Sequence, residues 1–300
     1  MAEKRSSGTR RVFEEVGASA PAAAPTPGVL SRGGGARRAI RAWLMVLFAL
    51  VAIMIAVGGL TRLTDSGLSI TEWRPVTGAI PPLSEADWQA EFEKYKKIPE
   101  YQLQNRGMTL EEFKSIYWWE WGHRLLGRVI GLVWALGLVW FWLRRQIPPG
   151  WTGRLILPGV LGGLQGAVGW WMVSSGLTGR MVDVASYRLA IHLGLAFVIF
   201  GVIGWMVFRL GRDEAELMQA RRARDARMMR WGNALVALIF VQVLLGALVA
   251  GIDAGRGYID WPLMNGQFLP DESFDYTPLW SNFFENPALV QFDHRMVGYA

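Results

Sequence analysis

Long apolar runs constrain the fold of this chain more than any other feature of its sequence. Each run reaches or approaches the roughly 20 residues that a helix needs to cross the hydrocarbon core of a bilayer. Because only helices and closed barrels satisfy their backbone groups in lipid, runs of this length predict an all-α integral membrane protein. The five complete runs lie near residues 39–60, 117–143, 155–176, 186–208 and 231–252.

The arginine-rich segments lie on one side of the predicted spans. Arg32, Arg37, Arg38 and Arg41 lie at the start of the first span, three arginines lie between the second and third spans, and seven lie from residue 209 through residue 230. The segment 254–287, on the opposite side, contains one arginine, Arg256. This asymmetry predicts a cytoplasmic N-terminus, and it explains the net charge of +6 by membrane topology rather than by nucleic-acid binding.

An internal repeat relates the two ends of the chain. At a constant offset of 188, the segment from Asp65 to Trp73 aligns with the segment from Asp253 to Trp261. The first two spans therefore correspond to the fifth span and to a sixth run that begins near Ala288 and is still in progress at Ala300. These copies have the same orientation, which indicates a parallel repeat of tandem four-helix bundles. We expect about six helices in this chain and eight in a longer, intact protein.

The stretch YWWEWGHRLLGR, residues 117–128, places ionisable groups at the mouth of the second span. Glu120 and His123 are three residues apart and share one helix face, and Arg124 lies four residues from both Glu120 and Arg128. Charged groups at membrane depth are costly, so they indicate a functional site. The plainer alternative is that Glu120 pairs with Arg124 or Arg128.

The chain has no cysteine and only three histidines: His123, His192 and His294. Each is expected near the external end of an even-numbered span, at a common depth of roughly 10 Å given the rise of a helix. Histidines on facing helices of a bundle are typical axial ligands of haem iron. His123 and His192 would form one such pair, and His294 would pair with a histidine beyond residue 300. A zinc site would need three or four ligands together, which the repeat separates.

The two copies of the motif differ in one residue that bears on chemistry. Glu120 aligns with Gln291, and only the carboxylate can take or give a proton. The first half is therefore expected to carry out chemistry, while the second stores or relays electrons. Arg124, Arg128 and Arg295 are expected to act as counter-charges to haem propionates or to extend toward the membrane surface.

The external loop 61–116 contains signals for short helices. Ser84 is expected to cap a helix with Trp88, Phe92 and Tyr95 on one face, and Thr109 is expected to cap the second span. We interpret the loop as lying on the membrane surface, with a lid over the site as the alternative.

Three stretches together resemble the haem A synthase family in its proteobacterial and mitochondrial branch, over residues 40–300. They are TRLTDSGLSITEWRPVTGAIPPLSEADW, the IPEYQLQNRGM and FKSIYWWEWGHRLLGR run, and FDHRMVGY. The resemblance implies eight helices in two halves and a haem b cofactor in the C-terminal half. It also implies oxidation of the C8 methyl group of haem O to a formyl group, giving haem A, in the N-terminal half of a bacterial inner-membrane protein.

The resemblance also implies roles for individual residues. Glu120 becomes the catalytic carboxylate, and His294 becomes an axial ligand of haem b, with Arg295 beside it. The substrate haem is assigned to His123, His192, Arg124 and Arg128. The implied partners are haem O, a haem O synthase (a farnesyltransferase), the lipid bilayer and an unidentified electron acceptor, with a homo-oligomer compatible and no nucleic acid.

The predicted organisation has four parts. Residues 1–38 form a disordered cytoplasmic tail without the apolar segment of a signal peptide. Residues 39–210 form the N-terminal half with the substrate haem site, 211–230 a cytoplasmic linker, and 231–300 an incomplete C-terminal half with the haem b site. The main alternative function is a di-haem b-type electron-transfer subunit. A transporter would need a polar central path, whereas the polar groups here gather at one end.

Overall fold

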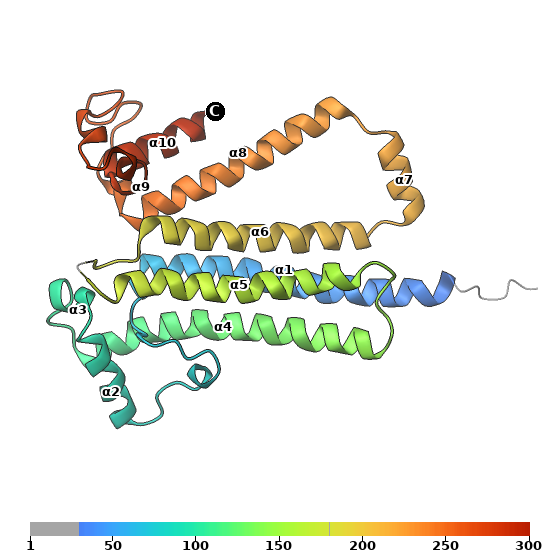
Figure 1. The fold of residues 1–300 in the computed structure, drawn as a ribbon, viewed down its shortest axis with the longest axis horizontal. Helices are drawn as coiled ribbons and strands as arrows, with labels where there is room; N and C mark the ends of the chain where they lie inside the picture. Colours follow the sequence, from blue (N-terminus) through green and yellow to red (C-terminus); the bar gives the residue numbers. More distant parts are fainter. Residues whose placement is uncertain (1–29, 180) are drawn as a thin grey trace, which may run out of the picture.

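The computed structural model describes residues 30–179 and 181–300 (Figure 1). Most of the predicted tail, residues 1–38, lies outside this part, and helix α1 already begins at Leu30. The described residues form helices and no named strand. The long helices are α1 (Leu30–Leu63), α4 (Leu110–Leu143), α5 (Thr152–Gly176), α6 (Ser186–Leu210) and α8 (Ala226–Gly251). The short helices are α2 (Glu85–Tyr95), α3 (Pro99–Leu103), α7 (Glu214–Arg222), α9 (Asn282–Glu285) and α10 (Pro287–Tyr299).

The five long helices are long and apolar enough to cross a membrane. They confirm the five complete spans and the all-α membrane fold predicted from the sequence. The sixth predicted run is helical from Pro287 to Tyr299, and this helix, α10, has 13 residues. The predicted linker, 211–230, contains α7 and the first turn of α8.

Four of the long helices form a bundle. Helix α1 packs against α4 and α6, and α5 also packs against α4 and α6, so α4 and α6 occupy opposite corners. Helix α8 packs against α6 and then diverges from it toward α7, while α10 packs against α8 (Figure 1). The segments that carry α2, α3 and α9 gather at one end of the bundle, and α7 lies at the other (Figure 1).

One face of α1 supplies much of the core between these helices. Ile40, Leu44, Leu47 and Val51 recur at helical spacing and are all buried. Apolar residues on the other faces of α1, such as Ile53, remain about half exposed, as expected for a surface that contacts lipid chains. Buried partners from the other helices are Phe141, Leu155, Ile199, Ile203, Met206 and Leu210.

At two places in the bundle, a tryptophan ring of one helix lies directly against a glycine of the neighbouring helix. The Trp43 indole donates to the Val133 carbonyl at 3.0 Å and occupies the space where a Cβ on Gly137 would stand. On the next pair of helices, Trp134 donates to the Leu155 carbonyl at 2.9 Å and covers Gly159 in the same way. Because a side chain on either glycine would collide with the ring, only glycine permits these helix contacts.

The loop 61–116 folds against the N-terminal end of α4, which we call the outer end of the bundle. Ser84 caps α2 and Thr109 caps α4, each in a reciprocal capping box, as the sequence predicts. Trp88, Phe92 and Tyr95 are buried, which confirms the predicted face. They pack on Phe113 and Tyr117 of α4, and the loop is therefore a packed part of the fold.

Candidate functional site

Glu120 lies buried at the outer end of α4, with 3% of the residue exposed. Its Oε2 accepts hydrogen bonds from the Ser69 hydroxyl and the Ile70 backbone N–H, both at 2.7 Å. Its Oε1 pairs with Arg124 Nη2 at 2.6 Å. Three donors thus hold one carboxylate, and two of them belong to the loop that follows α1. The ion pair between Glu120 and Arg124, the plainer alternative in the sequence, is present.

Arg124 and Arg128 fasten the same loop to α4. Arg124 donates to the carbonyls of Ile70 at 2.9 Å and Glu72 at 3.2 Å. Arg128 donates to the carbonyls of Pro75 at 2.8 Å and Arg74 at 2.9 Å, while its buried Nη1 has no partner. The segment 65–75 is therefore clamped across the outer end of the bundle, and we name it the clamped loop.

The clamped loop also reaches α5. Trp73 stacks on Trp170 with the ring centroids 5.9 Å apart, and Leu68 packs against Gly176. The loop thus covers the outer ends of both α4 and α5. The loop is therefore packed on the bundle, and its closure as a lid over a site stays a prediction.

The second half repeats the clamp with different chemistry. Arg295 donates to the carbonyls of Tyr258 at 2.5 Å and Asp260 at 2.9 Å, the counterparts of Ile70 and Glu72 at the offset of 188. Gln291, the counterpart of Glu120, donates its amide to the Tyr258 carbonyl at 2.9 Å. The clamp is therefore common to both halves, whereas the buried carboxylate belongs to the first half only.

Ser69 is a site residue that the sequence analysis missed. It is 1% exposed, and its hydroxyl is one of the three donors to Glu120. Its counterpart in the second half is Gly257, which has no hydroxyl and faces an amide instead of an acid. The repeat alignment contained this signal, because serine and acid occur together in one half and are both missing from the other.

Each histidine lies against a glycine of the preceding long helix. A Cβ on Gly58 of α1 would stand 2.9 Å from His123 Cε1 of α4. A Cβ on Gly169 of α5 would stand 2.8 Å from His192 Cε1 of α6. Because α4 and α6 are opposite corners of the bundle, these two histidines belong to helices that face each other across its interior, as the sequence predicts for a haem pair.

His294 has the same surroundings in the second half. It lies on α10 against Gly246 of α8, where a Cβ would stand 3.1 Å from the ring. Gly58 and Gly246 are counterparts at the offset of 188. The repeat predicted from the loops therefore extends into the packing of the histidines.

The polar atoms around these rings fit a haem. Among residues 30–179 and 181–300, none forms a hydrogen bond with the buried nitrogens His123 Nδ1, His294 Nδ1 and Arg128 Nη1. Imidazole nitrogens are the usual axial donors to haem iron, and an arginine nitrogen suits a propionate. In the part of the chain that the structure describes, no three His, Asp or Glu side chains gather as a zinc site requires.

Arg62 joins the two halves at the outer surface. It pairs with Asp65 at 2.7 Å, with Asp253 at 3.0 Å and with Asp183 at 3.7 Å, and it donates to the Ala250 carbonyl at 3.1 Å. Burial, together with the charges of the two neighbouring aspartates, raises the pKa of Asp183 despite the presence of Arg62.

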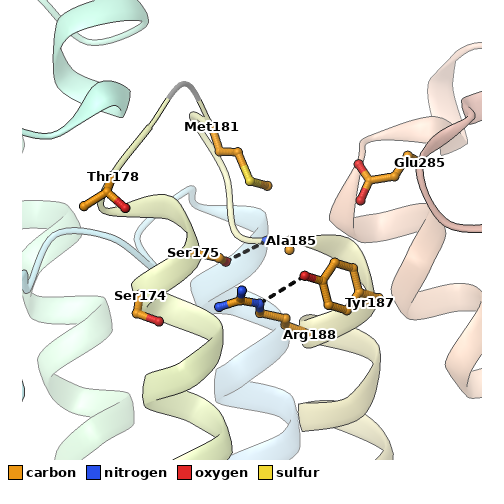
Figure 2. Close-up of a pocket in the computed structure, with 8 residues that line it drawn as sticks. All are labelled: Ser174, Ser175, Thr178, Met181, Ala185, Tyr187, Arg188 and Glu285. Atoms are coloured by element: carbon orange, nitrogen blue, oxygen red, sulfur yellow. Dashed lines mark hydrogen bonds between the residues drawn. The ribbon is translucent and has the colours of Figure 1, made fainter. Parts of the chain in front are cut away.

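A separate depression of about 570 Å³ opens near the outer ends of α5 and α6 (Figure 2). Arg188 lies in it, stacked on Trp171 and bonded to the Trp171 carbonyl at 2.7 Å. Glu285 of α9 faces it from the second half (Figure 2). None of the predicted site residues lines this depression, so it is distinct from the histidine sites.

The fold and the site together define a multi-pass membrane protein whose histidines lie in repeated, haem-compatible positions. Comparison with known proteins agrees with this class. The family model COX15-CtaA, described as cytochrome oxidase assembly protein, matches residues 41–300. The chain belongs to this family, and its similar members are haem A synthases. No solved structure matches the chain.

Three relatives, each named heme A synthase, illustrate the similarity. The protein from Ruegeria pomeroyi is 68% identical over 296 residues, covering 98% of this chain and 78% of the relative. The protein from Dinoroseobacter shibae is 67% identical over 302 residues, covering 100% and 78%. The protein from Paracoccus denitrificans is 62% identical over 292 residues, covering 97% and 77%. These matches confirm the family resemblance predicted from the sequence.

Proposed function

We propose that the N-terminal half oxidises the C8 methyl group of haem O to the formyl group of haem A. The observation that carries the proposal is the buried Glu120 one helical turn from His123, with His192 on the facing helix. Each hydroxylation adds a water oxygen to carbon and releases two electrons and two protons. Two rounds give a carbon with two hydroxyl groups, which loses water to become the aldehyde. The electrons pass to an acceptor that stays unidentified.

Glu120 would supply a fixed carboxylate beside the reacting methyl group. Ser69, Ile70 and Arg124 together hold it in one orientation, which suits a group that stabilises developing positive charge or receives a released proton. The same contacts tie the clamped loop to the acid. Closure of this loop over the substrate would exclude water and position Glu120 in a single step.

His123 and His192 would hold the iron of the substrate haem, one from each of two facing helices. Arg124, Arg128 and Arg295 all bind loop carbonyls. Among the described residues Arg128 also has a buried nitrogen, Nη1, without a hydrogen-bond partner, and this donor would be available for a propionate.

The C-terminal half would bind haem b through His294, with its unpartnered Nδ1 and its seat on Gly246 as the supporting observations. Bound there, haem b supplies one-electron transfer. Gln291 takes the place of the acid in this half, which fits a role in electron transfer rather than methyl oxidation. Arg295 supports the pocket by fixing its loop.

We also propose a location and partners for this reaction. We place the protein in the bacterial cell membrane with its N-terminus cytoplasmic, because the arginine-rich segments lie on that side. A haem O synthase would deliver the poorly soluble substrate directly. A homo-oligomer is compatible with the large lipid-facing surface, and nothing in the arrangement of basic residues suggests nucleic acid.

Replacing Glu120 tests the proposal. Glu120→Gln copies the residue found at this position in the second half, and Glu120→Ala removes the side chain. Both variants are expected to retain haem while forming no haem A, measured by pigment extraction from purified membrane protein. Normal haem A formation in both would exclude Glu120 from the mechanism. Extraction of b-type haem alone from active wild-type membranes would instead support the electron-transfer alternative.

A further inference from the structure

Each histidine faces two residues, one helical turn apart, on the preceding long helix. We call this pair of residues the seat of the histidine. Four positions before the glycine under each ring stands a larger residue. It is Met54 before Gly58, Gln165 before Gly169 and Gln242 before Gly246. Residues four apart lie one above the other on a helix face, so the earlier residue also faces the histidine. Two of the seats therefore contain a glutamine, and the third contains a methionine.

Both glutamines contact the ring and the backbone carbonyl of their histidine. Gln165 Nε2 lies 3.0 Å from the His192 carbonyl oxygen, 3.2 Å from His192 Nδ1 and 3.4 Å from His192 Nε2. Gln242 Nε2 lies 3.1 Å from the His294 carbonyl oxygen and 3.3 Å from His294 Nε2. One amide group thus connects the ring to the backbone of the same histidine. Such a contact restricts rotation of the ring.

Met54 occupies the place in the first repeat that Gln242 occupies in the second. A Cβ on Gly127 would stand 3.5 Å from the Met54 methyl group, and a Cβ on Gly298, its counterpart, would stand 3.2 Å from Gln242 Nε2. A thioether cannot donate a hydrogen bond. Met54 therefore cannot bind His123 as Gln242 binds His294.

We propose that Gln165 and Gln242 are positioning residues that fix the orientation of His192 and His294 toward haem, and that His123 lacks this restraint. The inference rests on the proposed assignment of these histidines as haem ligands. Groups that contact a metal-binding histidine orient its ring and tune the metal. The N-terminal pair is therefore asymmetric: His192 is the restrained ligand, and His123, one turn from Glu120, is the ligand free to reorient.

Exchanging the methionine of the first repeat and the glutamine of the second tests whether the glutamine restrains its histidine. Gln242→Met copies the natural first seat, and Met54→Gln copies the natural second seat. Gln242→Met is expected to weaken haem b binding by about 10-fold, the lower end for loss of such a contact. It is also expected to shift the low-spin electron paramagnetic resonance signal and the midpoint potential of haem b. Met54→Gln is expected to strengthen haem retention in the N-terminal half and to slow methyl oxidation.

Two controls separate this inference from the haem assignment. Val241→Met places a methionine on the adjacent, lipid-exposed face of α8 and should leave the signal and the potential unchanged. His294→Ala should abolish haem b binding, and retention of normal haem b would refute the assignment itself. If His294→Ala loses haem but folded Gln242→Met keeps the wild-type affinity, signal and potential, the glutamine inference is wrong. Size-exclusion elution and thermal midpoint of the purified variants establish folding.

Discussion

Glu100 of α3 offers a sharp test of how the external loop is stabilised. It is 3% exposed, its Oε1 lies 3.5 Å from Asn105 Nδ2, and its Oε2 has no partner. Burial, reinforced by the negative charges of Asp183, Glu120 and Asp65, raises the pKa of Glu100 to about 8. The acid is therefore mostly protonated at neutral pH.

The sign of the pH effect follows from this raised pKa. Between the ordinary value of 4.5 and about 8, the folded protein holds a proton that the unfolded chain has released. Stability therefore falls as pH rises through this window, and each unit corresponds to about 1.4 kcal/mol. Across the window this amounts to roughly 3–5 kcal/mol, an upper estimate for a single site. Glu100→Gln removes the proton equilibrium and its cost.

We expect Glu100→Gln to match wild type near pH 5 and to be increasingly more stable toward pH 8, with a constant difference above. Thermal unfolding in detergent from pH 5 to 9, with hydrogen exchange of residues 85–105, measures this. Glu85→Gln, whose parent side chain is 74% exposed, is the surface control and should run parallel to wild type. A Glu100→Gln curve that also runs parallel to wild type would refute the reasoning.

Three further variants test the packing, the acid and the junction. Gly159→Ala should lower the thermal midpoint, by about 1–3 kcal/mol in stability, because its Cβ would stand 2.0 Å from the Trp134 ring; Gly162→Ala, with nothing within 4 Å, is the control. Ser69→Ala should lower haem A formation, since Glu120 loses one of three donors, whereas unchanged haem A formation would limit Ser69 to packing. Arg62→Ala should lower the thermal midpoint less at high salt than at low salt, because salt screens the attraction between Arg62 and its three carboxylates; equal losses would contradict the charge argument.

The sequence predicted the helices well because membrane spans are defined by run length alone. It also predicted α2 and its buried face, since Ser84 and the spacing of Trp88, Phe92 and Tyr95 are local signals. Helix α1 starts earlier than expected because the glycine and arginine residues before the apolar run continue the helix rather than ending it. Residue type therefore identified the spans better than the residue at which α1 begins.

The site was only partly predictable. Glu120 and the three histidines stood out because ionisable groups are rare at membrane depth. The partners of the arginines did not, because backbone carbonyls leave no mark in a sequence: Arg124 and Arg295 bind loop carbonyls that any residue provides. Propionate binding by these two arginines stays a prediction, and the loop carbonyls would compete with a propionate for them. For Ser69 and the glycines under the histidines, the repeat alignment contains a signal, but the structure shows which side chains they contact.

Arg62 makes the contact between the two repeats asymmetric. Asp65 and Asp253 are counterparts in the repeat, and both have left-handed backbone, with φ of 47° and 51°. The counterpart of Arg62 itself is Ala250, whose carbonyl Arg62 contacts. One cation thus joins two equivalent anions, so the first half cannot be replaced by a second copy of the C-terminal half without losing the joint. The two halves are therefore not interchangeable: the first half contains both the buried acid, Glu120, and the arginine, Arg62, that binds the second half.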